Sequence, residues 1–183
     1  MAFVVIYDAN VLYPSVLRDV LIRLAQSGLV RARWTDRILD EVFRNLLANR
    51  PDLDPGKLAR TRELMNASVR DVLVEGYEAL MNALTLPDPD DVHVLAAAIR
   101  SHAQVIVTTN VRDFPEFELG RWDIEAKHPD DFLVDQFHLD GIALHVIVQQ
   151  VADSTAHPPM TFSDVLDNLE RSGITQASAL LRR

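Results

Sequence analysis

Apolar and polar residues alternate along the chain in a way that predicts short buried strands separated by helices. Strands are expected at Phe3 to Tyr7 and at Gln104 to Thr108, around apolar runs that are rich in β-branched residues and too short for a typical helix. Such unbroken runs are typical of central strands in a parallel sheet that helices cover on both faces. Residues 29–34 and 123–126 predict two further strands, and residues 71–75 predict a weaker one.

Apolar residues at helical spacing fill the intervals between these strands. The spacing predicts helices over residues 11–26, 35–49, 57–70 and 92–101. The helix at 92–101 is apolar around most of its circumference, so we expect it to be deeply buried. Strands that alternate with helices indicate an α/β fold with a parallel sheet.

The pattern changes after residue 138. A short helix is expected from Pro129, followed by helical segments at residues 142–151 and 163–181 with a polar, proline-containing break between them. We therefore predict a domain at residues 1–138 and a helical extension of unknown role at residues 139–183. The extension is expected to pack on the domain instead of standing alone.

Composition narrows the function classes. The chain has 183 residues, of which 48% are hydrophobic, and this favours one domain with a small appendage. A net charge of −9 excludes a broad basic surface for nucleic acid, although a local basic groove is compatible with it. The absence of cysteine excludes disulfides, thiol catalysis and cysteine-based zinc sites. With no signal-peptide pattern and no apolar stretch of membrane-spanning length, we expect a soluble cytoplasmic protein.

Acidic residues follow the two strongest strands. Asp8 comes directly after the first strand, Asp113 follows the strand at 104–108, and Asp91 begins the buried helix. Ligands of open parallel sheets bind outside the carboxyl ends of the strands, so these acids are expected to converge. Converging carboxylates repel each other unless a cation joins them. Oxygen ligands without cysteine favour Mg²⁺ or Mn²⁺.

Each acid taken alone also has a structural explanation. Asp8 is equally suited to capping a helix or forming a turn, and Asp88 and Asp90 are suited to capping the helix that follows them. Helix acids such as Glu41 are usually solvated. The metal hypothesis therefore depends on the joint pattern.

Four sequence blocks, taken in order, make the pattern recognisable. They are Asp8-Ala9-Asn10, the helix of residues 35–46 with Glu41, the block Asp91 to Ala98, and the block Val107 to Phe114. The chain resembles the PIN-domain family of metal-dependent ribonucleases, especially its bacterial toxin-like, VapC-type branch. The resemblance implies a three-layer α/β/α fold with a central parallel sheet, to which this chain adds the helical C-terminal extension.

The resemblance also implies the site. The residues implied as catalytic and metal-binding are Asp8, Glu41, Asp91 and Asp113, with Mg²⁺ or Mn²⁺ as cofactor, while Asn10, Thr108 and Asn110 would orient the ligands. Asn110 stands where many relatives have aspartate, so Asp113 is expected to supply the fourth charge. Arg37, Arg44 and Arg112 are candidate contacts to RNA.

The activity implied by the resemblance is endoribonuclease hydrolysis of RNA phosphodiester bonds, as the toxin of a toxin–antitoxin pair. The implied partners are an RNA substrate, a small antitoxin protein and a second copy of the chain in a homodimer, with no membrane.

Two alternatives stay open. A PIN-like module with a degraded site would bind RNA or protein without catalysis, and its signature would be loss of an acid, whereas the three main acids are present here. A magnesium-dependent phosphatase that begins with a strand and an aspartate needs a second aspartate two residues later, where this chain has Asn10.

Overall fold

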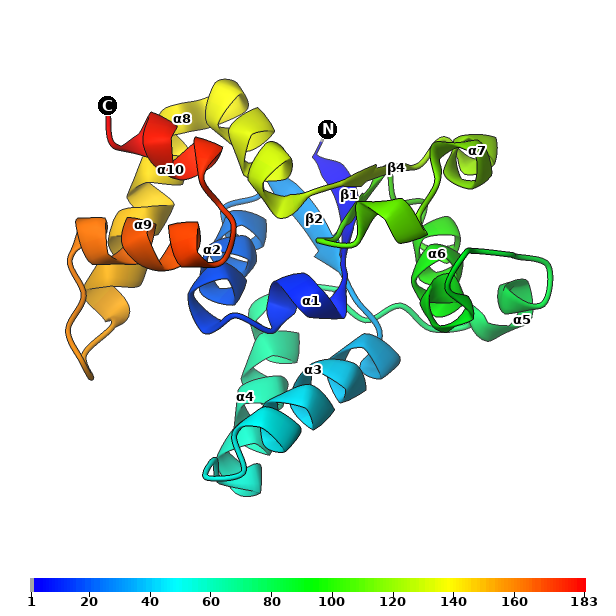
Figure 1. Ribbon diagram of the computed structural model, residues 1–183, viewed down its shortest axis with the longest axis horizontal. Helices are drawn as coiled ribbons and strands as arrows, with labels where there is room; N and C mark the ends of the chain where they lie inside the picture. Colours follow the sequence, from blue (N-terminus) through cyan, green and yellow to red (C-terminus); the bar gives the residue numbers. More distant parts are fainter. Residues whose placement is uncertain (1) are drawn as a thin grey trace.

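A four-stranded parallel sheet forms the centre of the molecule in the computed structural model, which describes residues 2–183 (Figure 1). The strands are β1 (Phe3–Tyr7), β2 (Val30–Arg33), β3 (Val105–Val107) and β4 (Glu125–Lys127), in the spatial order β2-β1-β3-β4. Tyr7 at the end of β1 pairs with Val107 at the end of β3. Residues that follow these two strands therefore emerge at one edge of the sheet.

Helices cover both faces of the sheet and extend beyond it. They are α1 (Ala9–Leu12), α2 (Ser15–Gln26), α3 (Asp36–Asn49), α4 (Pro55–Ser68), α5 (Glu78–Met81), α6 (Val92–Arg100), α7 (Glu116–Leu119), α8 (Pro129–Ser154), α9 (Phe162–Arg171) and α10 (Gln176–Leu181), with short 3₁₀ turns η1 (Pro89–Asp91), η2 (Val111–Asp113) and η3 (Gly120–Trp122). None of the described helices combines the length and the apolar character needed to cross a membrane.

The two faces are covered by different helices, which gives the expected three layers. The hydroxyl of Tyr7 on β1 donates to the carbonyl of Leu21 on α2 at 3.2 Å, and the ring of Tyr7 meets that of Phe132 on α8 edge to face at 6.2 Å. Helix α6 packs on β1 and β3 from the other side of the sheet (Figure 1). Its residues Val92 to Ala98 are all buried, as their apolar pattern predicts. The α/β/α fold is confirmed.

Several predicted elements differ in detail. The helix expected at residues 11–26 is divided into α1 and α2 because Pro14 takes an extended conformation and has no N–H group to continue the helical bonding. The weak strand expected at residues 71–75 is wrong. Only Leu73 forms a bridge, to Trp34, because β2 has already ended and the chain turns into the cap of α3 at Thr35.

The C-terminal helices pack on the domain. Helix α8 passes through residue 138 without ending and leaves helical geometry at Asp140. The helix expected at residues 163–181 is two helices, since Gly173 adopts a φ of +87° between α9 and α10. The buried carboxylate of Asp130 accepts the backbone N–H groups of Gln176 and Ala177 at 3.0 and 2.9 Å. These bonds hold α10 against the start of α8.

Candidate active site

Asp8 is held rigidly at the carboxyl end of β1. It is only 4% exposed. Its Oδ1 accepts the N–H of Ala9 at 2.7 Å and so caps α1, and its Oδ2 accepts the hydroxyl of Thr108 at 2.8 Å and the amide of Asn10 at 3.1 Å. Asp8 therefore caps a helix and also presents a buried carboxylate at the strand end.

Asn10 and Thr108 join the segments that follow β1 and β3. The amide of Asn10 donates to the Thr108 hydroxyl oxygen at 3.0 Å, and its carbonyl accepts the backbone N–H of Thr109 at 3.0 Å. The N–H of Asn110 donates to the same Thr108 oxygen at 3.1 Å. The orienting role predicted for Asn10 and Thr108 is compatible with this network, whereas Asn110 takes part through its backbone.

Three further carboxylates gather at the ends of η1 and η2. Single oxygens of Asp88, Asp91 and Asp113 lie within 4.8 Å of one another. Asp91 immediately precedes α6, and Asp113 closes the turn that follows β3. These three acids together are able to hold a metal ion. Their role as metal ligands stays a prediction.

Asp88 is the member of this group that the sequence pattern did not assign to a site. Its Oδ1 accepts the N–H of Asp90 at 2.9 Å, so its interpretation as a cap is also correct. The available signal was its position three residues before Asp91 in a proline-stiffened loop. Asp90 itself is exposed and lies outside the group.

Glu41 faces the site from α3. The helix begins after Thr35, whose hydroxyl oxygen accepts the N–H of Ile38 at 3.0 Å and so fixes the direction in which α3 leaves β2. The half-buried Glu41 carboxylate is close enough to raise the pKa of both Asp8 and Asp91. Asp8 and Glu41 lie outside the 4.8 Å group of Asp88, Asp91 and Asp113.

Crowded negative charge governs the electrostatics of the site. Burial, followed by the charges of Asp8, Asp88, Asp113 and Glu41, raises the pKa of Asp91 to about 7. Burial also raises the pKa of Asp8, while its hydrogen bonds from Thr108, Ala9 and Asn10 act in the opposite direction. A divalent cation would relieve this repulsion, so the donor set fits Mg²⁺ or Mn²⁺.

The candidate RNA contacts lie on the exposed surface around the acids. Arg37 and Arg44 are exposed on α3. Arg37, Glu41 and Arg44 stand at positions i, i+4 and i+7, so all three lie along one side of the helix. Arg112 is exposed on η2 and lines a cavity of about 350 Å³ together with Asp113 and His128. Positive side chains therefore border the acidic centre on two elements.

His93, two residues after Asp91, is buried in α6. Burial, with a smaller effect of the Arg37 charge, lowers its pKa to about 4. Its Nδ1 has no hydrogen-bond partner among the described residues. A neutral, packed imidazole agrees with the interpretation of this residue as part of the core.

Comparisons with known proteins agree with the architecture. A family model described as "PIN domain" matches residues 4–112, and one described as "VapC50 C-terminal domain" matches residues 129–183. A protein of Mycobacterium tuberculosis named "Putative ribonuclease VapC50" is 42% identical over 108 residues, which is 59% of this chain and 63% of that protein. No solved structure matches the chain. The fold, the order of the acidic blocks and the match over residues 4–112 place this chain in the PIN-domain family.

Proposed function

We propose that this chain is a divalent-metal-dependent endoribonuclease that acts as the toxin of a toxin–antitoxin pair. The observation that carries the proposal is the meeting of carboxylates from the ends of β1, η1 and η2 and from α3 at one edge of the sheet, where burial and then their charges raise the pKa of Asp91 to about 7. The relative from Mycobacterium tuberculosis, which is named a putative ribonuclease, supports the same class of reaction.

The metal ligands in this proposal are Asp8, Glu41, Asp91 and Asp113, with Asp88 as an added candidate. Mg²⁺ or Mn²⁺ bound there would supply positive charge to an RNA phosphodiester and acidity to a water molecule. Asn10 and Thr108 hold the Asp8 carboxylate in one orientation through bonds of 3.1 and 2.8 Å. One carboxylate of the cluster accepts the proton that the attacking water loses.

The arginines position the substrate. Arg37 and Arg44 stand on either side of Glu41 on α3, and Arg112 stands beside Asp113. Guanidinium groups bind phosphate oxygens in a bidentate manner, so they would hold the phosphates on each side of the bond that is cleaved. Single-stranded or loop RNA is the proposed substrate because its bases can be turned outward.

Partners complete the proposal. Similarity to a VapC-type protein favours a small antitoxin that covers the acidic centre, and a homodimer. Size-exclusion chromatography with light scattering tests for the homodimer. The same measurement, after co-expression with a small protein that an adjacent gene encodes, tests for the antitoxin complex.

The experiment for the activity is cleavage of total bacterial RNA by the purified protein with added Mn²⁺ or Mg²⁺. We expect cleavage that EDTA abolishes and that Asp8→Asn reduces by at least about 100-fold. Asp90→Asn makes the same chemical change outside the cluster and should leave cleavage within about twofold of the wild type. Circular dichroism verifies that each variant is folded.

Other outcomes of this experiment identify the alternatives. RNA that is bound but left intact at saturating metal would indicate a non-catalytic binding module. Hydrolysis of p-nitrophenyl phosphate without RNA cleavage would indicate a phosphatase. Either result would overturn the proposed function.

A further inference from the structure

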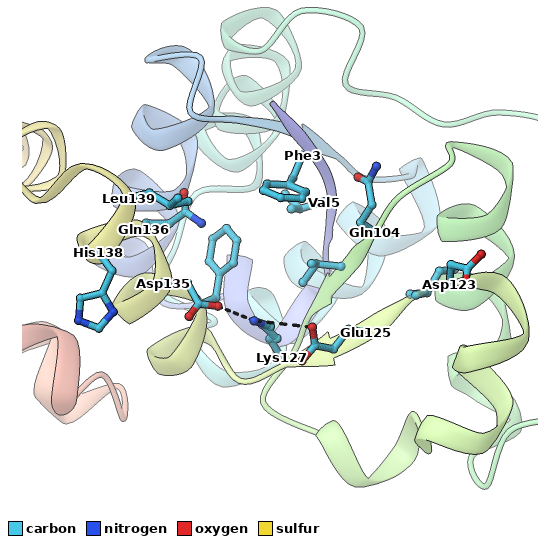
Figure 2. A pocket seen from close by; sticks show the side chains of 13 residues that line it. Phe3, Val5, Gln104, Asp123, Glu125, Lys127, Asp135, Gln136, His138 and Leu139 are labelled. Carbon is cyan, nitrogen blue, oxygen red and sulfur yellow. Dashed lines mark hydrogen bonds and ion pairs between the residues drawn. The ribbon is translucent and has the colours of Figure 1, made fainter. Parts of the chain in front are cut away.

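An open groove of about 680 Å³ lies on the sheet face that α8 covers only in part, as Figure 2 shows. Phe3, Val5 and Val105 form its apolar floor, and Phe132 and Leu139 of α8 form one wall. None of the acids proposed to bind metal lines it. Phe3 precedes Asp8 by five residues of extended chain, or about 16 Å, so this end of the groove is well separated from the candidate active site.

The groove exposes apolar side chains that water does not favour. Phe3 is 51% exposed and Leu139 is 64% exposed, whereas the side chains of Val5, Ile6 and Tyr7 on β1 are buried. Past Leu139, the same helix exposes Ile142 and Val146 at 81% and 48%. These two residues follow the break in α8 at Asp140 and do not line the groove.

The amide of Gln136 is buried beside the groove. Its side chain is only 4% exposed, and its Oε1 has no hydrogen-bond partner among the groups that the structure describes. Buried carbonyl oxygens without a partner are uncommon because they lose the hydrogen bonds that water gave them. Because this oxygen is itself buried, an occupant of the open groove does not contact it.

The charged residues at the rim of the groove indicate which charge its ligand carries. Asp123, Glu125, Asp135 and Lys127 line the rim, and the ammonium of Lys127 forms ion pairs with both Asp135 and Glu125 (Figure 2). With its one lysine already paired, the rim keeps an excess of negative charge. A second copy of a chain with net charge −9 is therefore a poor occupant, whereas a positively charged segment is complementary.

We propose that this groove binds a positively charged, amphipathic segment of another protein. Its apolar side chains would cover Phe3 and Leu139, and its lysines or arginines would meet the acidic rim. Lysine and arginine rim contacts add on-rate and specificity, while the apolar contacts supply most of the affinity. The inference does not depend on the proposed nuclease activity.

The test uses a fluorescein-labelled helical peptide of leucine and lysine, added to the full chain and followed by fluorescence anisotropy. We expect saturable binding that Phe3→Ser and Leu139→Ser each weaken by about tenfold. Phe117→Ser is the matched control, since Phe117 is 73% exposed and lies outside the groove. It should change the affinity by less than about twofold.

Two further variants separate the acidic rim from the buried amide. Glu125→Gln should weaken peptide binding and reduce its dependence on salt, because it removes one rim charge. Gln136→Leu should raise the melting temperature of the free protein, since it removes a buried oxygen without a partner, and should leave the peptide affinity within about twofold of the wild type.

Several results would overturn the proposal. Equal affinity of wild type, Phe3→Ser and Leu139→Ser would show that the peptide binds elsewhere, as would equal binding of a leucine–glutamate peptide. A dimer in sedimentation that Leu139→Ser dissociates would assign the groove to a second copy. Binding of the apolar dye 1-anilinonaphthalene-8-sulfonate that the peptide cannot displace would assign it to a small molecule. RNA cleavage by these variants is measured separately, so failure here leaves the nuclease proposal standing.

Discussion

The hydroxyl of Thr108 donates a 2.8 Å hydrogen bond to Oδ2 of Asp8, although the two residues are 100 positions apart in the sequence. The bond joins the segments that leave β1 and β3, and both residues are buried. It fixes one acid of the candidate active site before any ligand arrives. Orientation of a carboxylate by a neighbouring hydroxyl is how partners around a metal site commonly act.

Thr108→Val tests this relationship, because valine keeps the shape and removes the hydroxyl. We expect a loss of about 1–3 kcal/mol in the free energy of unfolding, since Asp8 and Asn10 each lose a buried partner. RNA cleavage should fall more than RNA binding does. Urea unfolding and single-turnover cleavage measure the two effects. Thr108→Ser, which restores the hydroxyl, should recover most of both, and failure to do so would contradict the orienting role.

Asp91 makes stability depend on pH when metal is absent. Its folded-state pKa of about 7 lies above that of an unfolded aspartate, near 3.9, so the folded protein holds more protons between these values. Stability in EDTA should therefore fall as the pH rises from about 4 to about 7 on account of this group. Asp91→Asn should be more stable than the wild type at pH 8 by on the order of 1 kcal/mol, after discounting for solvent screening.

The control is the same comparison at pH 4, where the difference should nearly vanish. Added Mn²⁺ should stabilise the wild type at pH 8 and affect Asp91→Asn much less. Chemical unfolding at each pH, with and without the ion, measures these differences. A variant that is no more stable than the wild type at pH 8 in EDTA would show that the carboxylates are not crowded as described.

His93 lowers the stability of the folded protein as the pH falls, whereas Asp91 lowers it as the pH rises. Burial lowers its folded pKa to about 4, so the unfolded chain takes up a proton first as the pH falls below about 6.5, and stability is lost between these values. His93→Gln removes this loss. The stability of the variant relative to wild type should improve by on the order of 2 kcal/mol between pH 7 and pH 4. A difference that stays constant with pH would mean that His93 takes up its proton at the same pH in the folded and the unfolded protein.

Asp130 is predicted to anchor the C-terminal helices. Asp130→Ala removes the acceptor of two backbone N–H bonds at the start of α10, so we expect a loss of about 1–3 kcal/mol and faster hydrogen exchange over residues 175–183. Asp131→Ala is the matched control, because Asp131 is exposed and makes one long side-chain contact of 3.4 Å. Equal exchange in the two variants would contradict the anchoring role.

The sequence predicted the strands and buried helices well because their apolar runs are strong and local. Phe3–Tyr7 was predicted with the bounds observed for β1. Five consecutive apolar residues that end at an aspartate are typical of a buried parallel strand. The break at Pro14 and the single bridge at Leu73 were missed, because both depend on where neighbouring elements end.

The site was harder to predict, since it depends on side chains that meet across the fold. Asp88 joins Asp91 and Asp113 through the path of the loop around Pro89, which spacing alone does not give. The unpartnered oxygen of Gln136 leaves no trace in the sequence pattern at all. Asp8, Glu41, Asp91 and Asp113 were predicted because the family resemblance supplied their roles, and these roles stay predictions.

The most direct test of the metal centre is anomalous scattering from a crystal soaked in Mn²⁺. Manganese ligated by Asp8 or Asp91, with Asp113 or Glu41 completing the set, is the expected result, and Asp8→Asn should lose or displace the ion. A wild-type crystal with no manganese among these carboxylates at saturating concentration would contradict the account.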